Sequence, residues 1–193
     1  MGCDPSRFGG DLSVIAIADD NELLPLHVFK KMDTMELTGN LIALYKQFKP
    51  VDIKVDVIGI GAGIVDRLRE QGYPVNPVNV SSAPNNTELF MNLRAEIWWN
   101  LRELLDPNNK RNIIFPDDEE LFSDLAAVQF KYNSRGKIQI EEKEEMKKRI
   151  QRSPDRGDAV AIAFSNVFNP ASLWYPDSAV TRRFGQNAYK GLI

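Results

Sequence analysis

Aspartates in three separate segments are the residues of this chain whose type and placement could support chemistry. Asp4 lies at the end of one extended segment, and Asp11 directly precedes an apolar run rich in Val and Ile. Asp56 ends a second strand-like segment, and Asp158 opens an apolar helical segment. Strand ends and a helix start hold carboxylates rigidly, and hard oxygen ligands suit Mg²⁺ or Mn²⁺. The pattern therefore predicts a cluster of carboxylates that binds divalent ions.

A further acid, Asp155, lies three residues before Asp158 and so shares its side of the predicted helix. Only one of the two needs to be a ligand. We favour Asp158, because the small apolar residues 159–163 let this helix approach the sheet closely. Asp155 has an alternative interpretation as an acid of the first helical turn, and Asp11 as a cap of the hairpin.

Other kinds of catalytic site have little support. With one histidine, His27, and one cysteine, Cys3, the chain lacks the residues for a His-based zinc site and for an internal disulfide. No GxxxxGK[ST] loop and no GxSxG motif is present, which disfavours ATP hydrolysis and serine catalysis. Two ions bridged by a carboxylate can activate water and stabilise the leaving oxygen in phosphodiester cleavage.

The glycines of Gly59-Ile-Gly-Ala-Gly63 follow a predicted strand and precede a predicted helix. The dinucleotide-binding fingerprint requires GxGxxG, and here the third glycine comes one position early. The segment 75–80 also lacks an acid at its end for a ribose. We therefore interpret these glycines as a tight strand-to-helix turn beside Asp56.

The hydrophobic pattern alternates between strand and helix periodicity. Strands are expected at 12–18, 23–31, 51–58, 73–80 and 113–115, and a hairpin at 130–140. Helices are expected at 35–48 with Thr34 as N-cap, and at 64–71, 87–105, 117–128, 141–150 and from about 155. A start with two hairpins followed by strand–helix alternation predicts an α/β fold, with a mixed central sheet flanked by helices.

Charge is unevenly distributed along the chain, whose net charge is −3. Residues 129–156 carry nine Lys and Arg against five acids, next to Asp158. A local basic excess of this kind is what contact with a phosphate backbone requires. A solvated helix with internal Glu–Lys pairs is the alternative. The candidate DNA-binding residues are Lys131, Arg135, Lys137, Lys148, Arg152 and Arg156.

The length of 193 residues predicts one domain, here 1–168, followed by an irregular tail at 169–193 that is rich in proline at its start. No apolar run is long enough for a membrane span, so we expect no membrane partner. Low cysteine use favours a reducing, cytoplasmic setting. Because the chain starts so close to Asp4, we expect it to be part of a longer protein.

Four segments occur in order along the chain. They begin with Asp4-Pro-Ser-Arg-Phe-Gly-Gly-Asp-Leu-Ser and Val55-Asp-Val-Ile-Gly-Ile-Gly-Ala-Gly-Ile-Val-Asp66, and continue with Asn92-Leu-Arg-Ala-Glu-Ile-Trp98 and Ser153-Pro-Asp-Arg-Gly-Asp-Ala-Val-Ala161. Together they resemble the C-terminal nuclease domain of the tailed-phage terminase large subunit. The resemblance covers residues 1–168 and implies a ribonuclease H-like fold. It implies that Asp4, Asp56 and Asp158 bind the catalytic metal, with Asp11 as an accessory.

The resemblance also implies an activity, which is cleavage of concatemeric double-stranded DNA during genome packaging. We therefore expect an endodeoxyribonuclease with two Mg²⁺ or Mn²⁺ ions and little sequence preference, acting in the host cytoplasm. The implied partners are an N-terminal packaging ATPase domain, the portal and the small terminase subunit. Two alternatives remain: a Holliday-junction resolvase of the same fold, and a non-catalytic module that docks on DNA or the portal.

Overall fold

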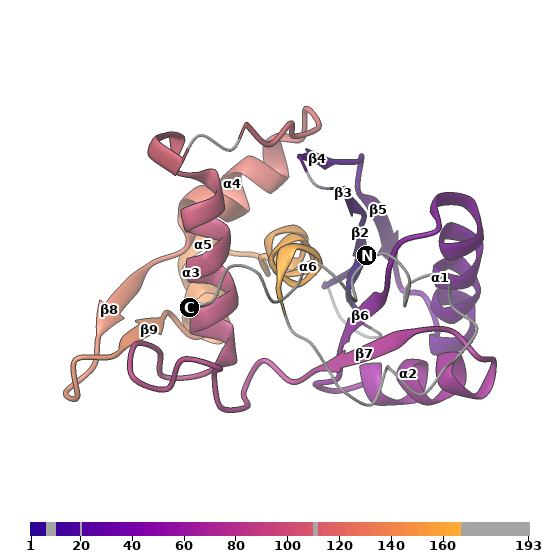
Figure 1. Cartoon of the computed structure of the whole chain (residues 1–193), viewed down its shortest axis with the longest axis horizontal. Helices are drawn as coiled ribbons and strands as arrows, with labels where there is room; N and C mark the ends of the chain where they lie inside the picture. Colours follow the sequence, from indigo (N-terminus) through magenta and orange to yellow (C-terminus); the bar gives the residue numbers. More distant parts are fainter. Residues whose placement is uncertain (7–10, 20, 110–111, 167–193) are drawn as a thin grey trace, which may run out of the picture.

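A central five-stranded sheet lies between two groups of helices in the computed structural model of the chain (Figure 1). The structure describes residues 1–6, 11–19, 21–109 and 112–166, so the expected glycine turn at 9–10 and the expected tail at 169–193 lie outside the described residues. The strand order is β5-β2-β1-β6-β7. These strands are β1 (Gly2–Asp4), β2 (Leu12–Ala16), β5 (His27–Lys30), β6 (Ile53–Asp56) and β7 (Val75–Val78). Strand β1 is antiparallel to β2 and parallel to β6, which confirms the predicted mixed sheet.

The helices are divided between the two faces of this sheet. Helices α1 (Thr34–Phe48) and α2 (Gly61–Glu70) cover one face. Helix α6 (Asp155–Phe164) packs on the other, with α3 (Leu93–Leu105), α4 (Glu119–Ala127) and α5 (Lys143–Ile150) beyond it. The smaller elements are β3 (Ala18–Asp19), which pairs with β4 (Glu22–Leu23), β8 (Phe130–Tyr132), which pairs with β9 (Ile138–Ile140), and the 3₁₀ turn Pro107–Asn109. No helix within the described ranges is long and apolar enough to cross a membrane.

Alternation along β1 sends its residues to opposite faces of the sheet. Cys3 is buried in the cluster beneath α1 and α2, together with its cross-strand neighbours Ile15 and Val55. Gly2 faces α6, whose backbone lies directly against it. A Cβ at Gly2 would stand 2.4 Å from the Ala163 nitrogen and 2.5 Å from the Ala159 oxygen. The predicted close approach of the small-residue helix to the sheet is therefore present.

The expected helix starts differ from the observed ones by one residue for α1, two for α4 and α5, three for α2 and six for α3. Helix α1 is capped by Asp33 rather than Thr34, because the Asp33 carboxylate accepts the N–H of Glu36 (2.8 Å) while the Glu36 side chain reaches back to Asp33. Helix α3 begins at Leu93 rather than near residue 87. Residues 87–89 instead form a turn, and Leu89 and Met91 exchange backbone hydrogen bonds with Ile138 of β9. Asn92 caps the helix.

Other expected elements are present in altered form. The expected strand 23–31 is divided between β4 and β5, and the expected strand at 113–115 is reduced to a bridge between Glu22 and Ile114. Helix α4 begins after Asp118, whose carboxylate accepts the N–H of Leu121 (2.9 Å). The expected hairpin at 130–140 is confirmed as the β8–β9 pair.

Substituting Gly2 with alanine tests the packing of α6 on β1. The new methyl group would overlap backbone atoms of α6, which cannot move aside as a flexible side chain can, so we expect unfolding free energy to fall by about 2 kcal/mol or more. Urea denaturation followed by circular dichroism measures the change. Gly39→Ala in α1 is the matched control, because a Cβ there meets nothing within 4 Å. Alanine should be neutral or stabilising at that site, and equal effects of the two substitutions would contradict the packing argument.

Candidate active site

Asp4 and Asp56 end the neighbouring parallel strands β1 and β6, and both project towards α6 from the same edge of the sheet. The first turn of α6 brings Asp155 and Asp158 to meet them. All four carboxylates line one cavity of about 450 Å³, and Asp11 lies at its wall. The structure thus brings together every acidic residue that the sequence predicted for the site. Three of them, Asp4, Asp155 and Asp158, are buried.

The start of α6 is held by residues of α4. Its N-cap position is Pro154, which offers no side-chain acceptor. The buried carboxylate of Asp124 instead accepts the N–H of Gly157 (3.1 Å) and forms an ion pair with Arg152. Arg156 pairs with Asp118 (2.9 Å), the N-cap of the same helix. These contacts make α4 a second anchor for the helix that carries two of the four acids.

Asp155 and Asp158 point to different partners although both belong to the first turn of α6. Oδ2 of Asp155 accepts the N–H of Leu12 (2.7 Å) and so ties α6 to the start of β2. Oδ1 of Asp158 accepts hydrogen bonds from Trp98 Nε1 (3.0 Å) and Arg94 Nη2 (3.3 Å), both on α3. Asp155 and Asp158 therefore each have one oxygen engaged by other parts of the protein, and each turns its second oxygen towards Lys143.

Lys143, the first residue of α5, places its ammonium group among the carboxylates. Its Nζ lies 3.0 Å from Asp4, 3.1 Å from Asp158 and 3.3 Å from Asp155. Burial would lower the pKa of Lys143, but the surrounding carboxylates raise it well above its ordinary value. One turn later, Lys147 pairs with Asp11 (2.6 Å). The sequence showed only that this region was basic, and no spacing signal identified Lys143 as the residue that enters the site.

The site concentrates more negative charge than Lys143 can neutralise. Burial raises the pKa of Asp4, and the neighbouring aspartates add to this although Lys143 opposes it. Burial likewise raises the pKa of Asp56 to about 6. For Asp158, burial acts in the same direction, but Lys143, Arg94 and the Trp98 hydrogen bond outweigh it and hold its pKa below the ordinary value. The cavity is therefore an electrostatic environment that favours an additional cation.

The donor chemistry of the cavity fits a hard divalent ion. Its acids are oxygen donors on strand ends and a helix start, and the ammonium of Lys143 marks a position where positive charge is stabilised. Among the residues that the structure describes, no three acidic, histidine or cysteine side chains stand close enough together to hold one ion. Binding a metal ion among Asp4, Asp56 and Asp158 would thus require Lys143 to withdraw and the carboxylates of Asp4 and Asp56 to come closer to that of Asp158.

The candidate DNA-binding residues fall into two groups. Arg152 and Arg156 are paired with acids of α4, and Lys137 donates to the backbone oxygen of Thr87 (2.5 Å). For Lys131, Arg135 and Lys148, no ion pair is formed with any residue in the described part of the chain. Lys131 is paired across the hairpin with Gln139, which lines the acidic cavity. The hairpin itself therefore flanks the acidic cavity.

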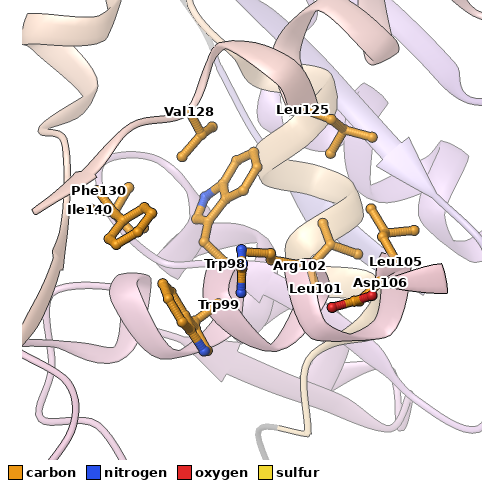
Figure 2. Close-up of a pocket in the computed structure, with 10 residues that line it drawn as sticks. All are labelled: Trp98, Trp99, Leu101, Arg102, Leu105, Asp106, Leu125, Val128, Phe130 and Ile140. Atoms are coloured by element: carbon orange, nitrogen blue, oxygen red, sulfur yellow. The ribbon is translucent and has the colours of Figure 1, made fainter. Parts of the chain in front are cut away.

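A second cavity, of about 340 Å³, lies against α3 and the β8–β9 hairpin (Figure 2). Its wall is mostly apolar and aromatic, and includes Trp98, Trp99 and Phe130. The charged residues that line it are Arg102, whose guanidinium lies over the Trp99 ring, and Asp106. It offers no group of acids or bases for catalysis, so the acidic cavity is the candidate active site.

The raised pKa of Asp56 predicts how the stability of the metal-free protein depends on pH. Between the ordinary carboxyl pKa of about 4 and the folded-state value of about 6, the folded protein holds a proton that the unfolded chain has released. The contribution of Asp56 to stability should therefore fall as pH rises through this window, by about 1–2 kcal/mol between pH 5 and pH 8. The buried Asp4 carboxyl, whose pKa is also raised, adds a loss of the same sign. Urea denaturation in EDTA measures it. Asp56→Asn should flatten the dependence, and an unchanged slope in this variant would contradict the assignment.

Comparison with known proteins gives matches in structure alone. No protein-family model and no curated protein matches the sequence. The nuclease domain of the large terminase subunit gp2 of bacterial virus Sf6 superposes with a TM-score of 0.73 at 21% identity, over 86% of this chain and 87% of that one. A mutant of that domain with manganese and β-thujaplicinol gives 0.72 at 20% identity, over 86% and 87%.

A nuclease domain from a second phage also matches this chain in structure. The large terminase nuclease from thermophilic phage G20c with bound magnesium gives a TM-score of 0.64 at 19% identity, over 86% of this chain and 79% of that one. These matches confirm the predicted ribonuclease H-like arrangement of a mixed sheet between helices. The chain therefore has the fold of the nuclease domains of phage large terminase subunits.

Proposed function

We propose that this chain is a metal-dependent endonuclease domain that cuts double-stranded DNA during phage genome packaging. The observation that carries the proposal is the meeting of four carboxylates, from β1, β6 and α6, in one cavity, where three of them lie within 3.3 Å of the Lys143 ammonium. The shared fold with terminase nucleases supports the same conclusion, as does the bound metal in several of those structures.

Asp4, Asp56 and Asp158 would hold two Mg²⁺ or Mn²⁺ ions. When bound, such ions supply an activated water and stabilise the charge that develops on the scissile phosphate and the leaving oxygen. The protein holds these ligands on strand ends and on α6. Asp155 keeps α6 in register with β2 through the N–H of Leu12. Lys143 neutralises the acids until metal arrives, which limits their mutual repulsion in the metal-free protein.

The β8–β9 hairpin would form one wall of the DNA groove. Lys131 and Arg135 lie on it with no partner acid in the described residues, so their charge is available to phosphates. Arg152 and Arg156, by contrast, are committed to α4 and are better explained as anchors of α6. In a complete terminase the substrate would be concatemeric DNA delivered by an ATPase domain at the portal, in the host cytoplasm.

Replacing each ligand separately tests the proposed activity. Asp4→Asn, Asp56→Asn and Asp158→Asn should each reduce Mn²⁺-dependent nicking of supercoiled plasmid by at least about 100-fold. Loss of a group that only orients a metal ligand can already reach that size, and a missing ligand removes charge from the metal directly. Circular dichroism should show the fold retained. Asp66→Asn, an exposed acid on α2, is the control and should cut like the wild type.

Wild-type nicking by any of the three variants at limiting Mn²⁺ would remove that residue from the ligand set. A wild-type protein that binds DNA but never cuts it would favour the docking module. Strong preference for a four-way junction over linear duplex would favour the resolvase.

Removing the hairpin charges tests the DNA groove. Lys131→Ala combined with Arg135→Ala should weaken binding to all duplex sequences alike, and should lower the slope of log affinity against log salt by about one for each phosphate that is no longer neutralised. Fluorescence anisotropy in Ca²⁺ measures both quantities. Lys46→Ala with Lys49→Ala makes the same charge change at the end of α1, across the sheet, and should leave the slope unchanged. Identical slopes for the two double variants would place the DNA elsewhere.

A further inference from the structure

The two oxygens of the Asp158 carboxylate have different partners. Oδ1 accepts the indole N–H of Trp98 (3.0 Å) and an N–H of Arg94 (3.3 Å). Oδ2 faces Lys143 Nζ at 3.1 Å, inside the acidic cavity. A carboxylate oxygen has about two lone-pair sites, so these two donors saturate Oδ1. Only Oδ2 is directed towards the position of the cation.

Packing in the hydrophobic core holds the Trp98 side chain in place. Its side chain belongs to the core, and the residue is 5% exposed. It lies four positions after Arg94, so α3 presents both donors on one face. The guanidinium of Arg94 lies 5.9 Å from the Trp98 ring centroid and also donates to the backbone oxygen of Glu141 (2.8 Å). Core packing of Trp98 and the hydrogen bond from Arg94 to Glu141 therefore hold these two donors in place, in addition to their contacts with the Asp158 carboxylate.

The glycine before Asp158, Gly157, leaves space that the indole ring of Trp98 occupies. A Cβ on Gly157 would stand 2.7 Å from Cη2 of Trp98 and 3.1 Å from Cβ of Asp124. Only a residue without a side chain lets the ring pass beneath the first turn of α6 and reach Oδ1. This contact gives a physical reason for glycine within Asp155-Arg-Gly-Asp158.

We propose that Trp98 is a positioning residue, whose indole N–H holds Oδ1 of Asp158 so that Oδ2 alone is presented to a metal ion. The inference rests on the proposed metal-dependent function and adds a residue to it. Without the indole N–H, the longer hydrogen bond from Arg94 would be the one left on Oδ1, and the carboxylate could rotate more freely about its Cβ–Cγ bond. The ligand oxygen would then be present in only part of the population. Groups that orient a metal ligand in this way typically contribute about 10–100-fold to metal affinity.

A purely structural role for Trp98 gives different expectations. A core tryptophan contributes through its buried ring, and loss of that ring lowers stability with or without metal. The hydrogen bond contributes through one atom, Nε1. Replacement of that atom alone separates the two roles. Benzothienylalanine has sulfur in place of the N–H and nearly the shape of tryptophan, so it is the matched substitution at position 98.

The experiment compares wild type, Trp98→Phe, the protein with benzothienylalanine at position 98, and Trp99→Phe. Trp99 is the control because it packs on Phe130 and Arg102 and makes no hydrogen bond to Asp158. Isothermal titration with Mn²⁺ gives the dissociation constant of each protein, and thermal melting in EDTA gives its stability. Plasmid nicking across a Mn²⁺ series separates the metal requirement from the maximal rate.

We expect both changes at position 98 to weaken Mn²⁺ binding by about 10–100-fold. The maximal nicking rate should recover largely at saturating Mn²⁺. The benzothienylalanine protein should melt close to the wild type, and Trp99→Phe should bind Mn²⁺ as the wild type does. Equal Mn²⁺ affinities in the wild-type and benzothienylalanine proteins would overturn the inference and leave the proposed function intact. A wild-type protein that binds no Mn²⁺ and cuts no DNA would overturn both.

Discussion

Repulsion among buried carboxylates is the constraint that shapes this molecule. Asp4, Asp155 and Asp158 are buried around the ammonium group of Lys143, and Asp56 lines the same cavity. Buried like charges are tolerated only when they are protonated, paired or neutralised by a cation. Here Lys143 provides the pairing for three acids at once. Lys143 and Arg94, which pairs with Asp158, bring two positive charges to four acids. Ionisation of all four carboxylates therefore leaves an excess of negative charge, and a divalent ion would neutralise it.

Holding the acids together requires a rigid frame on each side. On the sheet side, Gly2 lets the backbone of α6 at Ala159 and Ala163 lie directly against β1, which sets a short distance between the helix and the sheet. On the other side, Asp124 and the neighbouring α4 acids hold the first turn of α6 through Gly157, Arg152 and Arg156. Much of the basic charge in residues 129–156 therefore serves to assemble the site. The hairpin residues Lys131 and Arg135 are the ones that we propose for DNA contact.

Prediction from the sequence succeeded where local signals were strong. Alternating and helical periodicity placed the mixed sheet, the hairpin at 130–140 and the helix from Asp155. Prediction failed at residues 87–92, where a helical pattern was overridden by pairing of the segment with β9 and by the Asn92 cap. It also named Thr34 as a cap in place of Asp33, because two adjacent capping residues are hard to rank without the backbone.

Local patterns in the sequence were enough to identify the residues that could serve as ligands. Carboxylates at strand ends and at a helix start can be recognised from their immediate neighbours, because glycine turns and runs of small residues mark those positions. The tertiary packing of elements far apart in the sequence decides which basic side chains contact these carboxylates. Lys143 and Lys147 enter the site, Arg152 and Arg156 turn to α4, and Trp98 donates to Asp158 in addition to filling the core. The partner of each of these side chains depends on how helices that are far apart in the chain pack against one sheet. The spacing of residues within a single segment does not reveal that packing.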